Sequence, residues 1–518
     1  MHLQVNVFAK SRHDRRGATH PAFLAYAIPW AKRTSAVTPF AAALFGALAC
    51  SPIRVPPPPS AAPASIGRIL TRADATADVD TLMRILEHVH PDLYAERPRD
   101  SVAAAVHRIV ASLPASMSRA DLWLRLAPVL ASLGDGHTGI ALPSEEFAHN
   151  GGLVFPPSVV QDDAGHVVVV AAFSRGAPIE RGDRIISVNG LNADSLLRAW
   201  TGEVSGESEK FRAANVTNGF RDFVFVHSIA APFRIETQRA DGSTRPVVLD
   251  GLRRDSLRAL GGRGGGGAAR PRARAANFTY EKLAPGVGYM NFQSMVGDPS
   301  AFAADVTDMF RRVAEDSAQT LIVDLRSNGG GDSRLGEELL RHLTTKAYRM
   351  SAGKQWKMSA EYRAYFKTWL TPPLRWIGAW NFSSVGRQLM HGPDGKIVDL
   401  PEEEAVRPRA EPFFSGNVCV LIGRQTFSSA MGLADAIKTY KLATLIGEET
   451  GGRPTGFGEA YVFRLPKSQL AVSVSSARFV RASGDTSDHR GVVPDIAAGP
   501  SELAASTLSI QARNCSKL

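Results

Sequence analysis

A serine at the junction of a predicted strand and a predicted helix is the residue best suited to nucleophilic chemistry. The segment VCVLIGRQTFSSAMGLADAIK joins a buried-strand pattern to an apolar-periodic helix through a turn that carries Ser428 and Ser429. Such a junction exposes the Ser428 hydroxyl beside the positive end of the helix dipole. The simpler interpretation is that Ser428 only caps the helix, which is the commoner role of a serine at this position.

Two further segments contain residue types that activate a serine. His137 stands in SLGDGHTGI, and Asp485, Asp488 and Asp495 stand in SGDTSDHRGVVPDI near the end of the sequence. Taken singly, a loop histidine or an acid in a polar loop is typical of a protein surface. Together with Ser428 they supply the nucleophile, the base and the carboxylate that acyl transfer requires.

A run of three glycines, Gly329 to Gly331, follows Asn328 and the predicted strand LIVDLR. A glycine-rich turn at the carboxyl end of a strand leaves main-chain N–H groups free to converge on one acceptor. No Walker lysine follows and the pattern is not GxGxxG, so a phosphate loop is disfavoured. An oxyanion hole and a simple tight turn both fit this motif.

Hydrophobic spacing divides the chain into the regions that must position these residues. Residues 72–142 show apolar residues at three- and four-residue intervals, as in DVDTLMRILEHVH, which predicts helices. Residues 152–250 change to short runs such as HVVVVAAF and DRIISVNG, which are typical of strands. Residues 278–505 alternate strands and helices and predict an α/β layer with crossover connections.

Two segments do not fit this division. Residues 251–277 are a low-complexity Gly/Arg-rich linker that we expect to be exposed. Residues 345–412 contain four tryptophans among basic residues, at positions 356, 369, 376 and 380. They fit a lid, a membrane-facing flap or a packed insertion, and packing is favoured because aromatic side chains mostly fill cores.

The first 71 residues have the organisation of an export leader followed by a tether. Lys32 and Arg33 precede an uncharged apolar run that ends in Ala-Leu-Ala-Cys50, which resembles a bacterial lipobox. We interpret residues 1–50 as a leader with a lipoprotein-type signal, Cys50 as the lipidation site and residues 51–71 as a Pro-rich tether. A plain cleaved signal and an uncleaved membrane helix are the alternatives. The expected location is the bacterial cell envelope, facing the periplasm or the exterior.

The formal charge of +10 is concentrated in two segments outside the expected folded body. Residues 1–70 carry a net charge of +7 and residues 253–275 a net charge of +6, which leaves −3 for the remainder. A protein that binds a phosphate backbone needs a basic folded surface, so no nucleic-acid partner is predicted.

The three cysteines, Cys50, Cys419 and Cys515, show no CxxC or Cys/His spacing. Neither a zinc site nor a disulfide framework is therefore predicted, and no cofactor is expected. Cys419 lies in the buried-strand pattern VCVLI, where we interpret it as a small core residue.

The motifs DGHT, GDRIISVNG, LIVDLRSNGGG, TFSSAMGLADAIK, LIGEETGG and GVVPDI, in this order, resemble the C-terminal processing (tail-specific) serine peptidases. That family includes the tricorn protease core and the interphotoreceptor retinoid-binding proteins, and the resemblance covers roughly residues 75–500. It implies an α/β fold with a crotonase-like (ClpP/crotonase-type) catalytic core, a helical N-terminal cap and a PDZ-like β module at 152–250. Such a module binds an extended peptide or a C-terminus by strand addition, or serves only as a scaffold sheet.

The resemblance also implies roles for individual residues. One branch of the family uses a Ser-Lys dyad, but its lysine aligns with Arg453, which stays protonated and cannot act as a general base. In the tricorn-like branch the histidine matches His137 and the acid matches Asp488, where the family more often has glutamate. Asp485 is the alternative acid.

We therefore predict a serine endopeptidase that hydrolyses peptide bonds in C-terminal or unfolded protein segments through an acyl-enzyme. His137 takes the proton of Ser428, and Asp488 orients the imidazole and stabilises its charged form. The N–H groups of Gly330, or of a neighbour in the glycine run, and of Ser429 hold the oxyanion. The alternative is a non-catalytic protein that binds a peptide or an apolar ligand on the same fold. The expected partners are a polypeptide substrate and a membrane, reached through a lipid or N-terminal anchor.

Overall fold

The computed structural model describes residues 66–146, 152–172, 179–254, 256, 277–369, 372–382, 384–500, 502–503 and 507–517. The predicted leader, Cys50, most of the tether and most of the Gly/Arg-rich linker lie outside the described residues, so those assignments stay predictions. Within the described part of the chain, no helix combines the length and the apolar character needed to cross a membrane.

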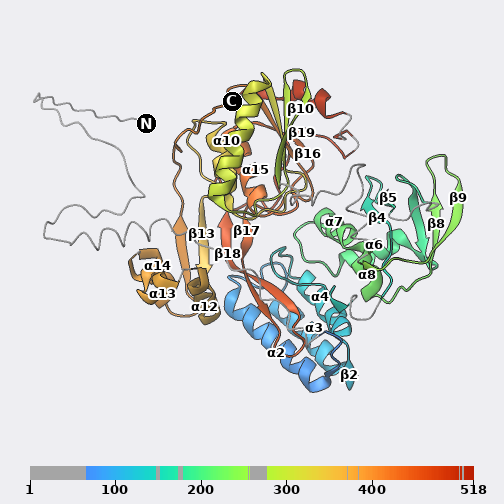
Figure 1. Ribbon diagram of the computed structural model, residues 1–518. Helices are drawn as coiled ribbons and strands as arrows, with labels where there is room; N and C mark the ends of the chain where they lie inside the picture. Colours follow the sequence, from blue (N-terminus) through green and yellow to red (C-terminus); the bar gives the residue numbers. More distant parts are fainter. Residues whose placement is uncertain are drawn as a thin grey trace, which may run out of the picture. The chain divides into compact units, whose positions relative to one another are not determined.

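A seven-stranded, mainly parallel sheet forms the centre of the C-terminal half of the chain (Figure 1). Six of its strands follow one another in space in the order β10 (Phe278–Ala284), β11 (Val287–Phe292), β12 (Thr320–Asp324), β15 (Asn417–Ile422), β16 (Thr444–Gly447) and β19 (Ile496–Ala497). The seventh, β20 (Ser516–Lys517), pairs with β15. The pairings from β11 to β19 are parallel, whereas β10 is antiparallel to β11. All five residues of β12 are buried, as expected for a central strand of a parallel sheet.

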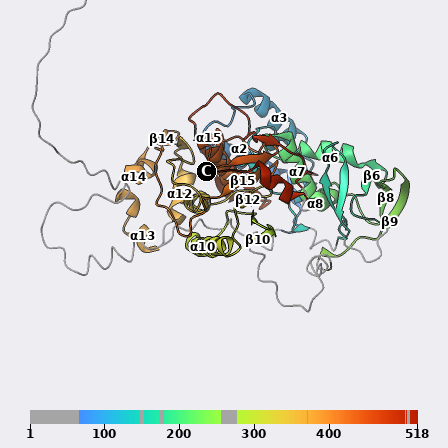
Figure 2. The same ribbon diagram turned by 90° about the horizontal axis from the view of Figure 1, so that it is seen from above.

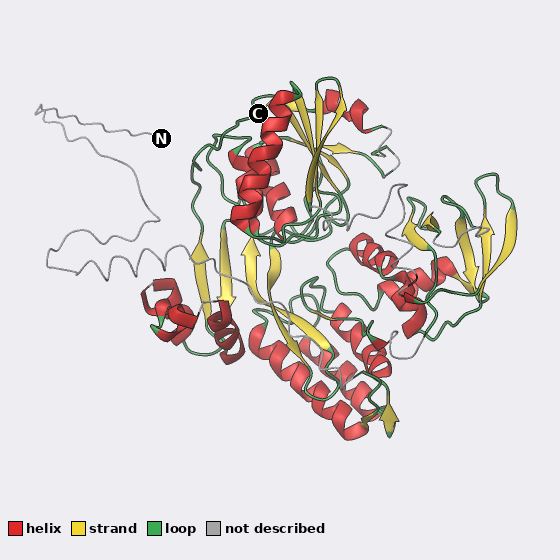
Figure 3. Ribbon diagram, viewed as in Figure 1, coloured by secondary structure: helices red, strands yellow, loops and turns green. Residues whose placement is uncertain are grey.

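Helices cover one face of this sheet, and a C-terminal segment packs on the other (Figure 3). The covering helices are α10 (Pro299–Glu315), α11 (Ser333–Arg341) and α15 (Ser429–Tyr440). On the second face, Ile322 and Leu421 pack with Leu508 of the short helix α16 (Leu508–Gln511). The sequence prediction of a mixed α/β fold is confirmed.

A disulfide joins Cys419 in β15 to Cys515, with 4.7 Å between their Cα atoms. The interpretation of Cys419 as only a small core residue was therefore wrong. The bond forms because β20 (Ser516–Lys517), directly after Cys515, pairs antiparallel with β15. The central sheet thus continues beyond residue 505, the predicted end of the core. Because 96 positions separate the two cysteines, no local spacing could reveal the pair.

A second sheet of five strands connects the C-terminal half to the preceding helices. Its order is β14 (Ile397–Pro401), β13 (Gly353–Lys357), β18 (Ala471–Val480) and β17 (Gly456–Arg464), and β3 (Gly139–Ile140) pairs with β18. The pairing joins Ile140 to Val472 and Gly139 to Ser473. The loop that carries His137 is therefore held against a strand that follows Ser428 in sequence.

The predicted helical region contains α2 (Arg72–Val89), α3 (Arg99–Ala111) and α4 (Arg119–Ala131). Both α2 and α4 begin with a capping box, in which Thr71 pairs with Asp74 and Ser118 pairs with Asp121. A two-stranded sheet of β1 (Leu70–Thr71) and β2 (Ser116–Met117) fixes the starts of the same two helices.

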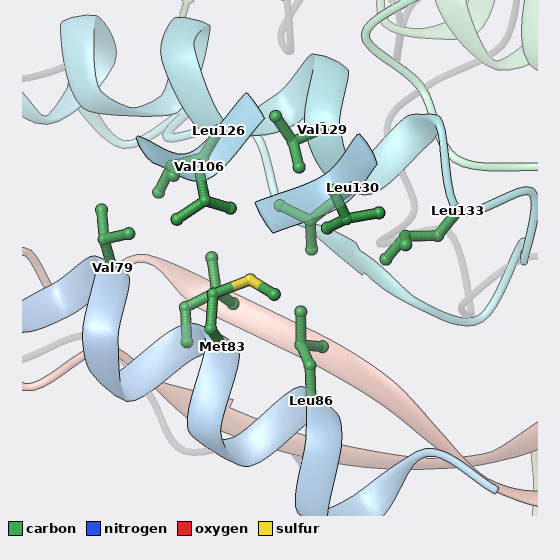
Figure 4. A pocket seen from close by; sticks show the side chains of 10 residues that line it. Val79, Met83, Leu86, Val106, Leu126, Val129, Leu130 and Leu133 are labelled. Carbon is green, nitrogen blue, oxygen red and sulfur yellow. The ribbon is translucent and has the colours of Figure 1, made fainter. Parts of the chain in front are cut away.

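Aliphatic side chains hold these helices together. In Figure 4, Val79, Met83 and Leu86 of α2 face Leu126 and Leu130 of α4. The space between them is about 10 Å³, which is room for no more than one water molecule. We regard this space as a packing defect of an apolar core and not as a ligand site.

The region predicted to consist of strands also contains helices. Its six-stranded antiparallel sheet is formed by β4 (Ser158–Gln161), β5 (Val167–Ala171), β6 (Arg184–Val188), β8 (Phe233–Gln238) and β9 (Thr244–Leu249), with β7 (Leu191–Asn192) on β6. Helix α6 (Ala193–Thr201) lies beside this sheet (Figure 2) and is followed by α7 (Glu209–Asn218) and α8 (Phe220–Val226). Trp200 stabilises these helices by packing against Phe220 and Phe223.

The tryptophan-rich segment 345–412 is in part a packed insertion. Besides β13 and β14 it forms α12 (Ala360–Trp369), α13 (Pro372–Trp376), a short 3₁₀ helix (Ala379–Phe382) and α14 (Ser384–His391). Trp356 is 8% exposed and belongs to a local core with Leu389, whereas Trp376 is 94% exposed. The interpretation as a packed insertion therefore holds for Trp356 and not for Trp376.

Asp78 generates a prediction about the attachment of α2 to the second sheet. Its fully buried carboxylate accepts hydrogen bonds from the main-chain N–H groups of Lys467 (2.8 Å) and Ser468 (2.7 Å) in the β17–β18 turn. Asp78→Ala removes the acceptor of the buried Ser468 N–H and of the half-buried Lys467 N–H. An unsatisfied buried donor costs about 1–3 kcal/mol, so we expect a clearly lower urea midpoint of unfolding. Asp80→Ala, at an exposed position of the same helix, is the matched control and should leave the midpoint unchanged. Equal midpoints for the two variants would contradict this account.

Candidate active site

Ser428 occupies the turn between β15 and α15 in a strained main-chain conformation. Its φ is 53° and its ψ is −127°, a combination that residues with a Cβ rarely adopt. The Ser428 side chain makes no capping hydrogen bond to α15, so the interpretation as a simple helix cap does not describe it. Its Oγ instead lies 2.9 Å from Nε2 of His137, 291 positions earlier in the chain.

The His137 imidazole is held in a mainly apolar environment. The ring of Phe427 stacks on it with 4.6 Å between ring centroids, and Phe211 of α7 stacks on Phe427 at 4.4 Å. Burial lowers the pKa of His137 below its usual range, while Asp135 and the main chain of Phe457 act in the opposite direction. A neutral imidazole whose Nε2 contacts a serine hydroxyl has the geometry of a general base.

Asp135 is a buried carboxylate beside this imidazole, although the sequence analysis assigned it no role. Its Oδ1 accepts the main-chain N–H of His137 at 2.9 Å and lies 3.9 Å from Nδ1 of the same residue. Its Oδ2 accepts hydrogen bonds from His90 (3.2 Å) and Ser475 (2.6 Å). Burial alone would raise the pKa of Asp135, but these hydrogen bonds and the two histidines hold that pKa well below its usual range. Asp135 is therefore ionised.

The structure does not bring the predicted acid, Asp488, to His137. The Asp488 carboxylate forms ion pairs with Arg481 and Arg490, and Arg490 is the main reason that the pKa of Asp488 falls well below its usual range. The alternative acid, Asp485, is exposed and accepts hydrogen bonds within its own turn. The motif places an acid in this loop, but the nearby arginines decide its partner.

The predicted oxyanion donors need one correction. The N–H of Gly330 donates to Oδ1 of Asn328 at 2.9 Å and is therefore not free for an oxyanion. In the described part of the chain, the main-chain N–H groups of Gly331 and Ser429 have no hydrogen-bond acceptor. The two segments are joined by a hydrogen bond of 2.6 Å from the Ser429 hydroxyl to the Gly331 carbonyl. This contact places the glycine run against the start of α15.

Among the described residues, two basic side chains near the Ser428 segment pair with acids elsewhere. Arg453, at the position of the dyad lysine, forms a 2.6 Å ion pair with Glu96. Lys438 of α15 pairs with Asp495. Both side chains therefore have partners other than Ser428.

Glu207 is a site residue that no sequence motif identifies. It precedes α7, and its Oε2 is buried without a hydrogen-bond partner. Burial, followed by the nearby charge of Asp135, raises the pKa of Glu207 to about 8. Asp135, His137 and Glu207 each offer a ligand-type atom, and these atoms lie within 4.8 Å of one another.

A cavity of about 530 Å³ lies next to the His137 loop. Its wall includes Gly136, which precedes His137, and Phe211 of the aromatic stack. Much of the remaining wall is apolar, with contributions from Trp123, Ile140, Phe223, Val462 and Val472. A cavity of this kind can accept the side chain of an extended polypeptide.

Comparison with known proteins gives one match of sequence and several matches of fold. Residues 286–498 match the sequence model of peptidase family S41. Mature CPAF complexed with lactacystin has a similar fold, with a TM-score of 0.61 and 16% identity over 86% of this chain and 99% of that chain. A serine-to-alanine mutant of CPAF gives a TM-score of 0.60 and 17% identity over 85% and 95%. For the photosystem II D1 C-terminal processing protease the TM-score is 0.41 and the identity 16%, over 83% of this chain and 95% of that chain. No curated protein sequence matches the chain.

Gly330 generates a prediction about the serine. Its φ is +93°, and a Cβ at this position would lie 2.7 Å from the Cβ of Ser428 and 2.8 Å from the Phe427 carbonyl oxygen. We expect Gly330→Ala to displace the nucleophile and to slow labelling of Ser428 by a fluorophosphonate probe by about 10–100-fold. A Cβ at Gly329 would meet nothing within 4 Å, so Gly329→Ala is the matched control. If both variants label at the wild-type rate, the close approach of Gly330 has no importance for the site.

Proposed function

We propose, from the match of residues 286–498 to peptidase family S41, that this chain is a serine-type endopeptidase acting on C-terminal or unfolded protein segments. The observation that carries the proposal is the 2.9 Å contact between Oγ of Ser428 and Nε2 of His137. A non-catalytic binding protein on the same fold would have no need for a strained serine in contact with a neutral imidazole.

The proposed reaction begins with His137 as the general base. Its Nε2 takes the proton of Ser428 while Oγ attacks the carbonyl carbon of the scissile peptide bond. The main-chain N–H groups of Ser429 and Gly331, which have no acceptor among the described residues, are the proposed donors to the oxyanion. His137 then donates the proton to the departing amine, which leaves an acyl-enzyme on Ser428. Water activated by His137 hydrolyses this ester and restores the free enzyme.

Asp135 supports this cycle electrostatically. It is ionised and buried, and its Oδ1 lies 3.9 Å from Nδ1 of His137, which is close enough to stabilise the imidazolium but too long for a hydrogen bond. The hydrogen bond to the main-chain N–H of His137 fixes the loop and therefore the position of the imidazole. We assign to Asp135 the electrostatic role that the sequence analysis gave to Asp488.

The proposed substrate is an extended polypeptide. The 530 Å³ cavity beside His137 supports this proposal because its apolar wall suits side chains that an unfolded segment exposes. We propose that the core is crotonase-like, that α2–α4 act as its cap, and that residues 152–250 form a PDZ-like module. The antiparallel sheet of that region ends in the edge strand β9, a geometry that peptide binding by strand addition requires.

We also propose that the protein is exported to the bacterial cell envelope and anchored through lipidated Cys50. The leader pattern is the main support for this location. The disulfide between Cys419 and Cys515 adds a second, because disulfides form and persist in oxidising compartments.

Substitution of the two contacting residues tests the mechanism. We expect Ser428→Ala and His137→Ala each to reduce cleavage of casein or a tagged peptide on the order of 10³-fold or more, because each removes the activated nucleophile. The double variant should be no worse than either single variant, since the two residues act as one unit. Arg453→Ala, which breaks the ion pair with Glu96, should retain most of the activity. Full activity of Ser428→Ala, or a harmless His137→Ala beside an inactive Arg453→Ala, would overturn this assignment.

A further inference from the structure

Two buried polar atoms without a hydrogen-bond partner lie at or near the imidazole of His137. Nδ1 of His137 is buried and has no hydrogen-bond partner, and Oε2 of Glu207 is buried and has none either. When Nε2 of a neutral histidine accepts the proton of a serine, Nδ1 must carry the other proton and needs an acceptor. Asp135 does not meet this need, because its Oδ1 lies 3.9 Å away, and the Phe457 main chain, although near enough to raise the pKa of His137, makes no hydrogen bond of acceptable geometry to Nδ1.

The main chain is shaped to let Glu207 approach the histidine loop. A ring nitrogen of His137 and a carboxylate oxygen of Glu207 lie within 4.8 Å of each other. A Cβ on Gly136 would lie 2.8 Å from Oε2 of Glu207 and 2.7 Å from the ring of Phe427. Any larger residue at position 136 would therefore push the carboxylate away from the imidazole.

Glu207 comes from a different part of the chain from the catalytic pair. It lies between α6 and α7, and its neighbours contact the core directly. The Ser208 hydroxyl donates a 3.1 Å hydrogen bond to the Gly451 carbonyl, and Phe211 stacks on Phe427. Docking of this segment thus places Glu207 beside His137.

We propose that Glu207 is the acceptor for the Nδ1 proton of His137, and that the 152–250 region completes the peptidase site through this positioning residue. The proposal rests on the function given above and deepens it. In this proposal Nδ1 of His137 donates to Oε2 of Glu207, so that each atom gains the hydrogen bond it lacks. The hydrogen bond fixes the imidazole tautomer and stabilises the imidazolium once the Ser428 proton arrives. A segment outside the S41-matched residues 286–498 then controls the basicity of His137.

The surroundings of Glu207 give this role a pH signature. The charged groups that face it are Asp135 and His137 in the histidine loop and Arg453 after β16. Burial and Asp135 raise the pKa of Glu207 to about 8, against the weaker opposing effects of main-chain N–H groups at Glu207 and Gly136 and of Arg453. The carboxylate, which is the better acceptor, therefore forms only as the pH rises through about 8. The reactivity of Ser428 should rise over the same interval.

Glu207→Gln tests the proposal, because glutamine keeps the shape of the side chain and cannot ionise. The primary readout is the rate of Ser428 labelling by a fluorophosphonate as a function of pH, measured on the full chain. We expect a decrease of about tenfold or more at pH 8.5 and loss of the rise near pH 8, with an unchanged thermal midpoint. For a cleaved peptide, kcat should fall while KM stays constant.

Glu209→Gln is the matched control, since Glu209 is exposed in the first turn of α7 only two residues away. It should keep the wild-type rate and pH profile. A wild-type profile in Glu207→Gln, or a slower reaction that keeps the rise near pH 8, would overturn the proposal and leave Glu207 a structural residue. Labelling of Ser428 needs no peptide substrate, so absence of peptide cleavage by the wild type would count against the proposed function alone.

Discussion

The buried carboxylate of Asp135 is the interaction on which the geometry of the site depends. Its two oxygens connect three segments: the end of α2 through His90, strand β18 through Ser475, and the loop of His137 through the main chain. An ionised carboxylate in an apolar surrounding is costly unless hydrogen bonds satisfy it. The same requirement that stabilises Asp135 therefore fixes the orientation of the loop, and with it the approach of the imidazole to Ser428.

The serine is positioned by an opposite kind of constraint. Ser428 is held in a main-chain conformation that costs free energy, and packing around it maintains that conformation. Asn328 organises the glycine run, and the Ser429 hydroxyl ties that run to the first turn of α15. The stack of Phe211, Phe427 and His137 then excludes water from one side of the imidazole. Strain on the nucleophile and burial of the base are thus maintained by the same few contacts.

The sequence was sufficient for features whose physics is local or whose motif is specific. The turn around Ser428, the helices within residues 72–142 and the α/β alternation follow from spacing alone. The pairing of His137 with Ser428 followed from the family resemblance. Asp488 forms an ion pair with Arg481 and does not contact His137. Which cation a loop carboxylate pairs with depends on distances in the folded protein that sequence order does not give.

Other features could not be predicted because they depend on contacts between segments that are distant in sequence. Glu207 lies in an unremarkable polar segment, and only the docking of that segment against Gly136 removes its carboxylate from water. The Cys419–Cys515 bond likewise depends on a strand pairing between distant segments. Helices α6–α8 escaped detection because Trp200 and its aromatic neighbours stabilise short helices that have weak patterns of their own.

The separation of 291 positions between His137 and Ser428 gives the protein a built-in latency. The two side chains come into contact only after the N-terminal helices, the β17–β18 hairpin and the core sheet have folded against one another. Contacts this distant in sequence form late, since closing such long loops costs conformational entropy before any gain is made. A chain that is still unfolded therefore has no assembled Ser428–His137 pair.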